Sequence, residues 1–114
     1  MTDLDFTLCS IPMLISRNNS KAYHDQIVSR YTVLMRFLKD NNLIYKEPFN
    51  SDGSLKMDLV LKKSDVTSQC LELFKKAIPA WHAQIDRSGK VDNVSKLIKA
   101  MDQIQAYDPS VRRH

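Results

Sequence analysis

The stretch SDVTSQCLELFKKAIPAWHAQIDR, residues 64–87, decides the fold because it holds the single Trp of the chain and the most regular helical spacing. Read at 3.6 residues per turn, its apolar residues fall on one face and most of its charged residues fall elsewhere. Ser64, Asp65 or Thr67 can cap the start of this helix, and Gly89 suits a left-handed end. The stretch therefore predicts a core helix. Its apolar face consists of Cys70, Phe74, Ala77, Ile78, Trp81 and Ile85.

Pro79 interrupts this helical pattern two residues before Trp81. Proline has no backbone N–H, and its ring clashes with the carbonyl four residues earlier, which costs ~3 kcal/mol or more in a helix interior. We therefore expect a kink or a break in the helix at Pro79.

Helical patterns also lie on either side of this stretch. The first begins at Lys21, after the helix-initiating residues Asn18-Asn19-Ser20, and ends at Asn41-Asn42. The other begins near Asp92, which could cap it, and Asp108-Pro109 stops it. Their apolar stripes are Tyr23, Ile27, Tyr31, Leu34 and Leu38 in the first, and Val94, Leu97, Ile98, Met101 and Ile104 in the second.

Residues 43–63 carry a different pattern, which predicts a β-hairpin. Asp52-Gly53 is a tight-turn dipeptide, and after it Leu55, Met57, Leu59 and Leu61 alternate with mostly polar residues. Pro48 has no N–H to donate, so the first strand must lie at an edge or be short.

These patterns predict an α+β fold that is mostly α, with three helices and one antiparallel β-hairpin between helices 1 and 2. A winged-helix-like arrangement is one form of this fold. We expect a single domain over residues 1–114, with an extended N-terminal arm over 1–18 and a frayed tail over 108–114. The predicted core consists of Trp81, Phe74, Leu34, Leu38, Leu59 and Leu97.

Composition and charge argue against a basic nucleic-acid-binding block, a zinc site and a membrane-spanning or secreted protein. The net charge of +4 is spread along the chain without a basic block, so Lys62-Lys63, Lys75-Lys76 and Arg112-Arg113 are interpreted as solvated pairs. Cys9 and Cys70 lack zinc-site spacing and are expected to be reduced and buried. We expect no metal, no cofactor and, since the sequence shows neither a secretory signal nor a membrane span, a cytoplasmic protein.

The sequence offers few groups for catalysis. His82 and Asp86 are four residues apart, so on a helix Asp86 could orient His82 as a general base. A surface ion pair is the commoner outcome of that spacing. Cys70 lies on the apolar stripe, where a structural thiol is expected. The chain has only two glycines, so a glycine-rich phosphate loop is absent. We therefore expect that the protein is not an enzyme.

A partial pattern from Leu61 to Ile104 resembles small bacterial immunity proteins of contact-dependent and polymorphic toxin systems. The matching segments are Leu61 to Thr67, Trp81, Ile85-Asp86-Arg87 and Leu97 to Ile104, with departures at Val66 and Cys70, where the group has Leu and Gly. The resemblance implies a cytoplasmic, non-enzymatic inhibitor that occludes a cognate toxin domain, nuclease-like in our interpretation. Its partner surface is predicted on the hairpin, at Tyr45, Glu47, Phe49, Asp52 and Asp58, because aromatic and acidic groups suit a basic groove.

A weaker resemblance, to MarR-type winged-helix regulators, supplies the alternative. Leu38 to Ile44, the Asp52-Gly53 hairpin and Thr67 to Trp81 are similar in order and spacing to the recognition helix, wing and following helix of that family. The chain departs at Asn42, where the family has Gly, and it lacks the wing arginine and the upstream helices. This resemblance implies a DNA-binding transcriptional regulator, with a basic face made of Arg30, Arg36, Lys56 and Lys62.

Overall fold

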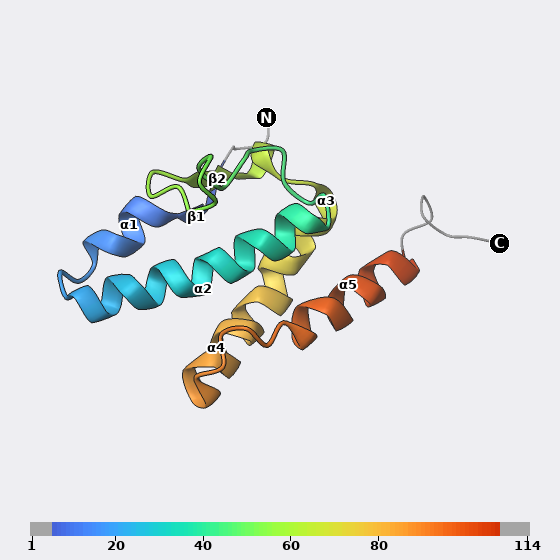
Figure 1. Ribbon diagram of the computed structural model, residues 1–114. Helices are drawn as coiled ribbons and strands as arrows, with labels where there is room; N and C mark the ends of the chain where they lie inside the picture. The colour runs from blue at the N-terminus through green and yellow to red at the C-terminus, as the bar shows by residue number, and fades with distance from the viewer. Residues whose placement is uncertain (1–5, 108–114) are drawn as a thin grey trace. The chain divides into compact units, whose positions relative to one another are not determined.

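The computed structural model describes residues 6–107, with side chains described for 6–104, and the predicted tail 108–114 lies outside this range. The chain divides into two compact units, Met1–Thr67 and Ser68–His114. Figure 1 labels the elements of both units. The first contains β1 (Thr7–Ser10), α1 (Ile11–Ser16), α2 (Lys21–Asp40), β2 (Val60–Lys62) and a 3₁₀ turn (Lys63–Asp65). The second contains α3 (Ser68–Glu72), a π-helical segment (Leu73–Ala77), α4 (Ile78–Ser88) and α5 (Ser95–Tyr107).

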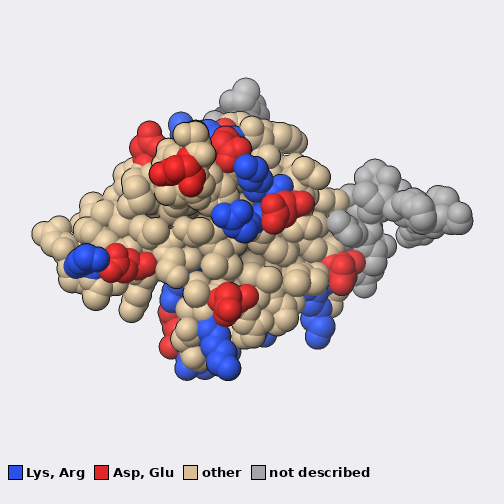
Figure 2. Space-filling view, in the orientation of Figure 1, with Lys and Arg blue, Asp and Glu red and all other residues tan. Residues whose placement is uncertain are grey.

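The predicted fold class is confirmed: the structure is α+β, mostly helical, with one two-stranded antiparallel sheet. No helix within the described range is long and apolar enough to cross a membrane. On the face shown in Figure 2, basic and acidic side chains are interspersed rather than separated into blocks of one sign.

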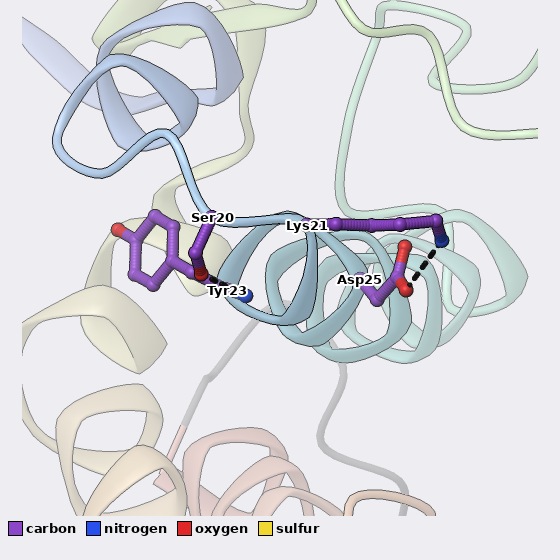
Figure 3. Close-up of polar contacts among 4 residues, drawn as sticks. All are labelled: Ser20, Lys21, Tyr23 and Asp25. Atoms are coloured by element: carbon purple, nitrogen blue, oxygen red, sulfur yellow. Dashed lines mark hydrogen bonds and ion pairs between the residues drawn. The ribbon is translucent and has the colours of Figure 1, made fainter.

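Helix α2 begins where the sequence predicts. The Ser20 hydroxyl accepts a hydrogen bond from the Tyr23 backbone N–H (3.0 Å), and Lys21 pairs with Asp25 one turn later (2.9 Å), as Figure 3 shows. The Tyr23 hydroxyl donates to the carbonyl of Leu14, at 2.9 Å, and so ties α2 to α1. The short connection between the two helices is therefore fixed by side chains at both its ends.

Helix α2 ends in a Schellman motif. Asn42 takes the left-handed conformation, with φ of 57°, its N–H donates to the Lys39 carbonyl (3.0 Å), and the Leu43 N–H donates to the Leu38 carbonyl (2.9 Å). Leu38 and Leu43 are both buried, which supplies the hydrophobic contact typical of this motif. The predicted end of the helix at Asn41-Asn42 is confirmed.

The strand pairing differs from the predicted hairpin. β2 pairs with β1 of the N-terminal arm, with Cys9 opposite Leu61 and Ser10 opposite Val60, and not with residues 43–50. Within the predicted hairpin only the bridge between Phe49 and Leu55 forms outside the named strands. The predicted strand forms only at its end, Val60–Lys62, and Met57 is exposed rather than on the buried face. The alternating pattern could not predict the partner strand, because every strand offers the same backbone donors and acceptors.

The N-terminal arm is also more regular than predicted. Pro12 does not merely end the extended segment but lies in the first turn of α1, where its missing N–H costs no helical hydrogen bond. The Ser10 hydroxyl caps this helix by accepting from the Met13 N–H (3.3 Å). Residues 7–16 of the arm are therefore a strand followed by a short helix.

In the second unit the predicted kink or break at Pro79 takes the form of a π-helical segment before it, and the helical conformation continues from Ser68 to Ser88. Along this helix the buried residues are Cys70, Leu73, Ile78, Trp81 and Ile85, so the step from Leu73 to Ile78 is five residues instead of three or four. The Ile78 N–H donates to the Leu73 carbonyl, five residues back, which produces this longer step. Phe74, which the sequence places in the core, is only half-buried, because Leu73 takes the inward position.

Trp81 joins α4 to the start of α5. Its side chain is fully buried, and its ring N–H donates to the Asn93 carbonyl at 3.0 Å. The side chain of Asn93 satisfies a free N–H at the start of α5, since its Oδ1 accepts from the Ser95 N–H (3.1 Å) and from the Ser95 hydroxyl (2.8 Å), whereas Asp92, the predicted cap, lies three residues before the helix. Gly89 ends α4 in the predicted left-handed conformation, with φ of 74°.

Candidate functional site

The segment between α2 and β2, residues 43–59, holds all five residues of the predicted partner surface. Backbone hydrogen bonds fix its start, because the Tyr45 N–H donates to Asp65 (2.8 Å) and the Thr67 N–H donates to Leu43 (2.9 Å). Buried apolar residues attach the segment to its unit, and these residues are Leu43, Pro48, Phe49, Leu55 and Leu59. It is therefore a loop with little regular structure of its own and a fixed position within its unit.

The tip of this loop is the predicted tight turn. The Asn50 N–H donates to the Ser54 carbonyl (2.8 Å), and the Gly53 N–H donates back to Asn50 (2.9 Å). Gly53 has a φ of 88°, which explains why glycine stands there. Asp52 accepts from the backbone N–H and the hydroxyl of Ser54, at 3.0 and 2.6 Å. These hydrogen bonds lower the pKa of the Asp52 carboxyl, so it remains charged at neutral and mildly acidic pH.

Four of the five predicted residues are exposed and one is not. Tyr45 is 72% exposed, and Glu47, Asp52 and Asp58 are also at the surface. Phe49 is only 6% exposed, so its predicted place on the exposed surface is wrong. Its ring packs into the unit because the turn at Asp52-Gly53 brings Phe49 back against Leu55 and α2.

Basic residues of α2 that the sequence did not assign to this site lie beside the loop. The Arg36 guanidinium lies 4.9 Å from the centre of the Phe49 ring, and Lys39 pairs with Glu47 at 3.0 Å. The Lys39 ammonium and the Phe49 N–H both hydrogen-bond to Glu47 and lower the pKa of its carboxyl. Arg36 and Lys39 are three residues apart on one helix, so they lie on the same face of α2. That spacing was the signal in the sequence that both could contact the same loop.

The basic residues of the DNA-binding alternative lie on α2, on the loop and on β2, and the hairpin predicted as a wing does not form, because β2 pairs with β1. Arg36 lies over Phe49, Lys56 is half-buried on the loop, and Lys62 is exposed on β2, which pairs with β1. Arg30 is half-buried on α2. DNA binding by these residues stays a prediction.

The cysteine and histidine side chains, which are the candidate catalytic groups, lie in surroundings typical of structural roles. Burial raises the pKa of the Cys9 and Cys70 thiols to about 12, so neither is a thiolate at neutral pH. His24 lies within hydrogen-bond distance of the Asn18 carbonyl, at 2.6 Å, and holds the connection between α1 and α2. The ring of His82 lies 5.0 Å from that of Trp81. No cluster of potential metal ligands occurs in the part of the chain that the structure describes.

Comparison with known proteins identifies no relative of this chain. No protein-family model, curated protein or solved structure matches the chain. The candidate site is an anchored loop that displays one tyrosine and several carboxylates.

Proposed function

We propose that the protein is a non-enzymatic binding protein that occludes a partner protein, and that the partner is a toxin domain of a bacterial polymorphic toxin system. The observation that carries this proposal is the loop 43–59, in which Tyr45 is largely exposed on a segment held at its ends. Loops on a fixed scaffold commonly carry binding residues, and tyrosine is enriched in interfaces. The resemblance of Leu61 to Ile104 to immunity proteins supplies the class of partner.

Two exposed carboxylates of the loop suit a basic partner surface. Asp52 and Asp58 lie in the same loop as Tyr45, and the pKa of Asp52 is lowered; the loop also carries Lys46 and Lys56, so the attraction is local to the two aspartates. Such carboxylates accelerate association with the basic groove of a nuclease-like domain, because complementary potentials steer the encounter.

The first experiment is coexpression with the product of the neighbouring upstream gene. The proposal expects a stoichiometric complex and a neighbour that is toxic when expressed alone. The Tyr45→Ala variant should weaken protection against the toxin without loss of folding, since the side chain is 72% exposed. No complex with a neighbouring gene product would contradict the proposal and favour the regulator, for which titration of a DNA duplex at ~50 mM salt is the test.

A double variant separates the charge of the loop from its folding. Asp52→Asn with Asp58→Asn removes two charges but keeps an acceptor oxygen for the Ser54 bonds. Asp92→Asn with Asp102→Asn makes the same change at exposed positions of the other unit. The loop pair should slow association about tenfold and the control pair should not, since rim charges act mainly on the association rate. Equal effects of both pairs would contradict a loop-centred interface.

A further inference from the structure

The second unit has a groove that the proposed function does not use. It lies between the π-helical segment with the start of α4 on one side and α5 on the other, and its volume is about 830 Å³. Small or aliphatic residues contributed by both walls form its apolar part, namely Ala77, Ala80, Ala100 and Ile104. The α5 residues that line it recur at Lys96, Lys99, Ala100, Gln103 and Ile104, which is a face of α5 adjacent to the buried Leu97 and Met101.

Positive charge borders this groove on both sides. Lys75 and Lys76 come from the π-helical segment, Lys96 and Lys99 come from α5, and all four side chains are exposed. The single carboxylate that lines the groove belongs to Glu72, which pairs with Lys75 at 3.1 Å. Within the described residues, Lys76, Lys96 and Lys99 have no ion pair, so their charge is available to a ligand.

The π-helical segment places two consecutive lysines at this groove. A π turn carries one residue more than an α turn over the same rise, and such turns are frequent at functional sites. Here the additional residue lies between the buried Leu73 and Ile78, and Lys75 and Lys76 of this segment both line the groove. The basic wall is therefore part of the irregular segment of the helix.

We propose that this groove binds an acidic amphipathic helix of a partner protein. Its apolar interior, made by side chains of two helices, fits apolar residues at i, i+3, i+4 and i+7 of a third helix. Its lysine borders fit glutamates or aspartates on the flanks of that helix. A membrane surface is a poorer fit, because binding there needs apolar residues that protrude, and these apolar residues line a hollow. This inference goes beyond the proposed function and uses the other compact unit.

The test is fluorescence anisotropy with a labelled peptide of about 14 residues, which spans about 20 Å as a helix. The peptide carries leucine at the four anchor positions and glutamate on both flanks. Its control has lysine in place of every glutamate. The proposal expects saturable binding of the acidic peptide only, and the absence of saturation at about 1 mM protein would overturn it.

Matched variants locate the binding. Lys76→Glu with Lys99→Glu reverses charge on both walls, and Ala80→Phe fills the groove without a change in charge. Lys21→Glu with Lys90→Glu makes the same charge change at exposed positions outside the groove. The two groove variants should each bind the acidic peptide about tenfold or more weakly, and the control should bind as wild type does.

Other outcomes overturn the proposal. Equal weakening by the control pair would mean that net charge alone attracts the peptide. Binding to vesicles of anionic lipid without binding to the peptide would assign the lysines to a membrane surface. If circular dichroism shows that a groove variant is unfolded, Lys76→Gln with Lys99→Gln replaces it, and unchanged peptide affinity in that folded pair would also overturn the proposal.

Discussion

Replacement of Trp81 by alanine should destabilise the second unit more than any surface change in the same helix. The indole is fully buried, and its N–H donates to the Asn93 carbonyl. Truncation of a buried aromatic residue to alanine costs about 3–5 kcal/mol, because the transfer energy is lost and a cavity remains. Trp81→Phe keeps most of the ring but loses the hydrogen bond, whose net value is about 0.5–1.5 kcal/mol.

The assay is urea denaturation followed by circular dichroism, which needs no tryptophan signal. The order of stability should be wild type, then Trp81→Phe, then Trp81→Ala, and the exposed Arg87→Ala should lie within about 0.5 kcal/mol of wild type. In wild-type protein the single tryptophan supplies a second probe, since its fluorescence should shift to longer wavelength as this unit unfolds. A Trp81→Ala cost below about 1 kcal/mol would refute the argument that this side chain organises the unit.

Three further predictions follow from local geometry. Gly89→Ala should cost about 1–2 kcal/mol in denaturant titration, because φ is 74° and open space surrounds the added Cβ, so the cost is backbone strain alone. Asn93→Ala removes the cap of α5 and should cost about 0.5–2 kcal/mol, whereas Asn93→Asp should retain most of the stability. Burial raises the pKa of Cys9 and Cys70 from 9.0 to about 12, so the folded state holds these protons more tightly than the unfolded state. The free energy of unfolding should therefore not depend on the thiols below pH 9 and should fall as the pH rises from 9 toward 12. The double variant Cys9→Ser with Cys70→Ser should flatten that fall. At pH 8 a thiol reagent should react with both residues only after denaturation.

Local signals in the sequence predicted the helices well. Ser20 accepts the hydrogen bond that its residue type suggests, and Asn42 and Gly89 adopt the left-handed conformations that end α2 and α4. These features depend on residues within a few positions of one another, so the sequence carries them directly. The buried position of Trp81 follows from helical periodicity for the same reason.

Features that depend on distant residues were not predictable in this way. The pairing of β2 with β1 joins residues far apart in the sequence, and hydrophobic alternation defines the faces of a strand without naming its neighbour. Phe49 was predicted on an exposed edge because the sequence pattern predicted a hairpin over residues 43–63 instead. The hollow of the second unit was missed as well, since Lys75, Lys76, Lys96 and Lys99 each resemble ordinary solvated lysines until the fold brings them to one groove.

The five-residue step from Leu73 to Ile78 has a consequence for tolerance of sequence length. A deletion inside a regular helix rotates everything after it by about 100° and turns the core face outward. Here the removal of Lys76 would shorten a π turn to an α turn and leave Leu73, Ile78 and Trp81 on the same face. Combined with Pro79→Ala, which removes the ring that disrupts a regular helix, such a shortened chain should still fold. The core does not require the additional residue, so this position can instead contribute a side chain to the protein surface.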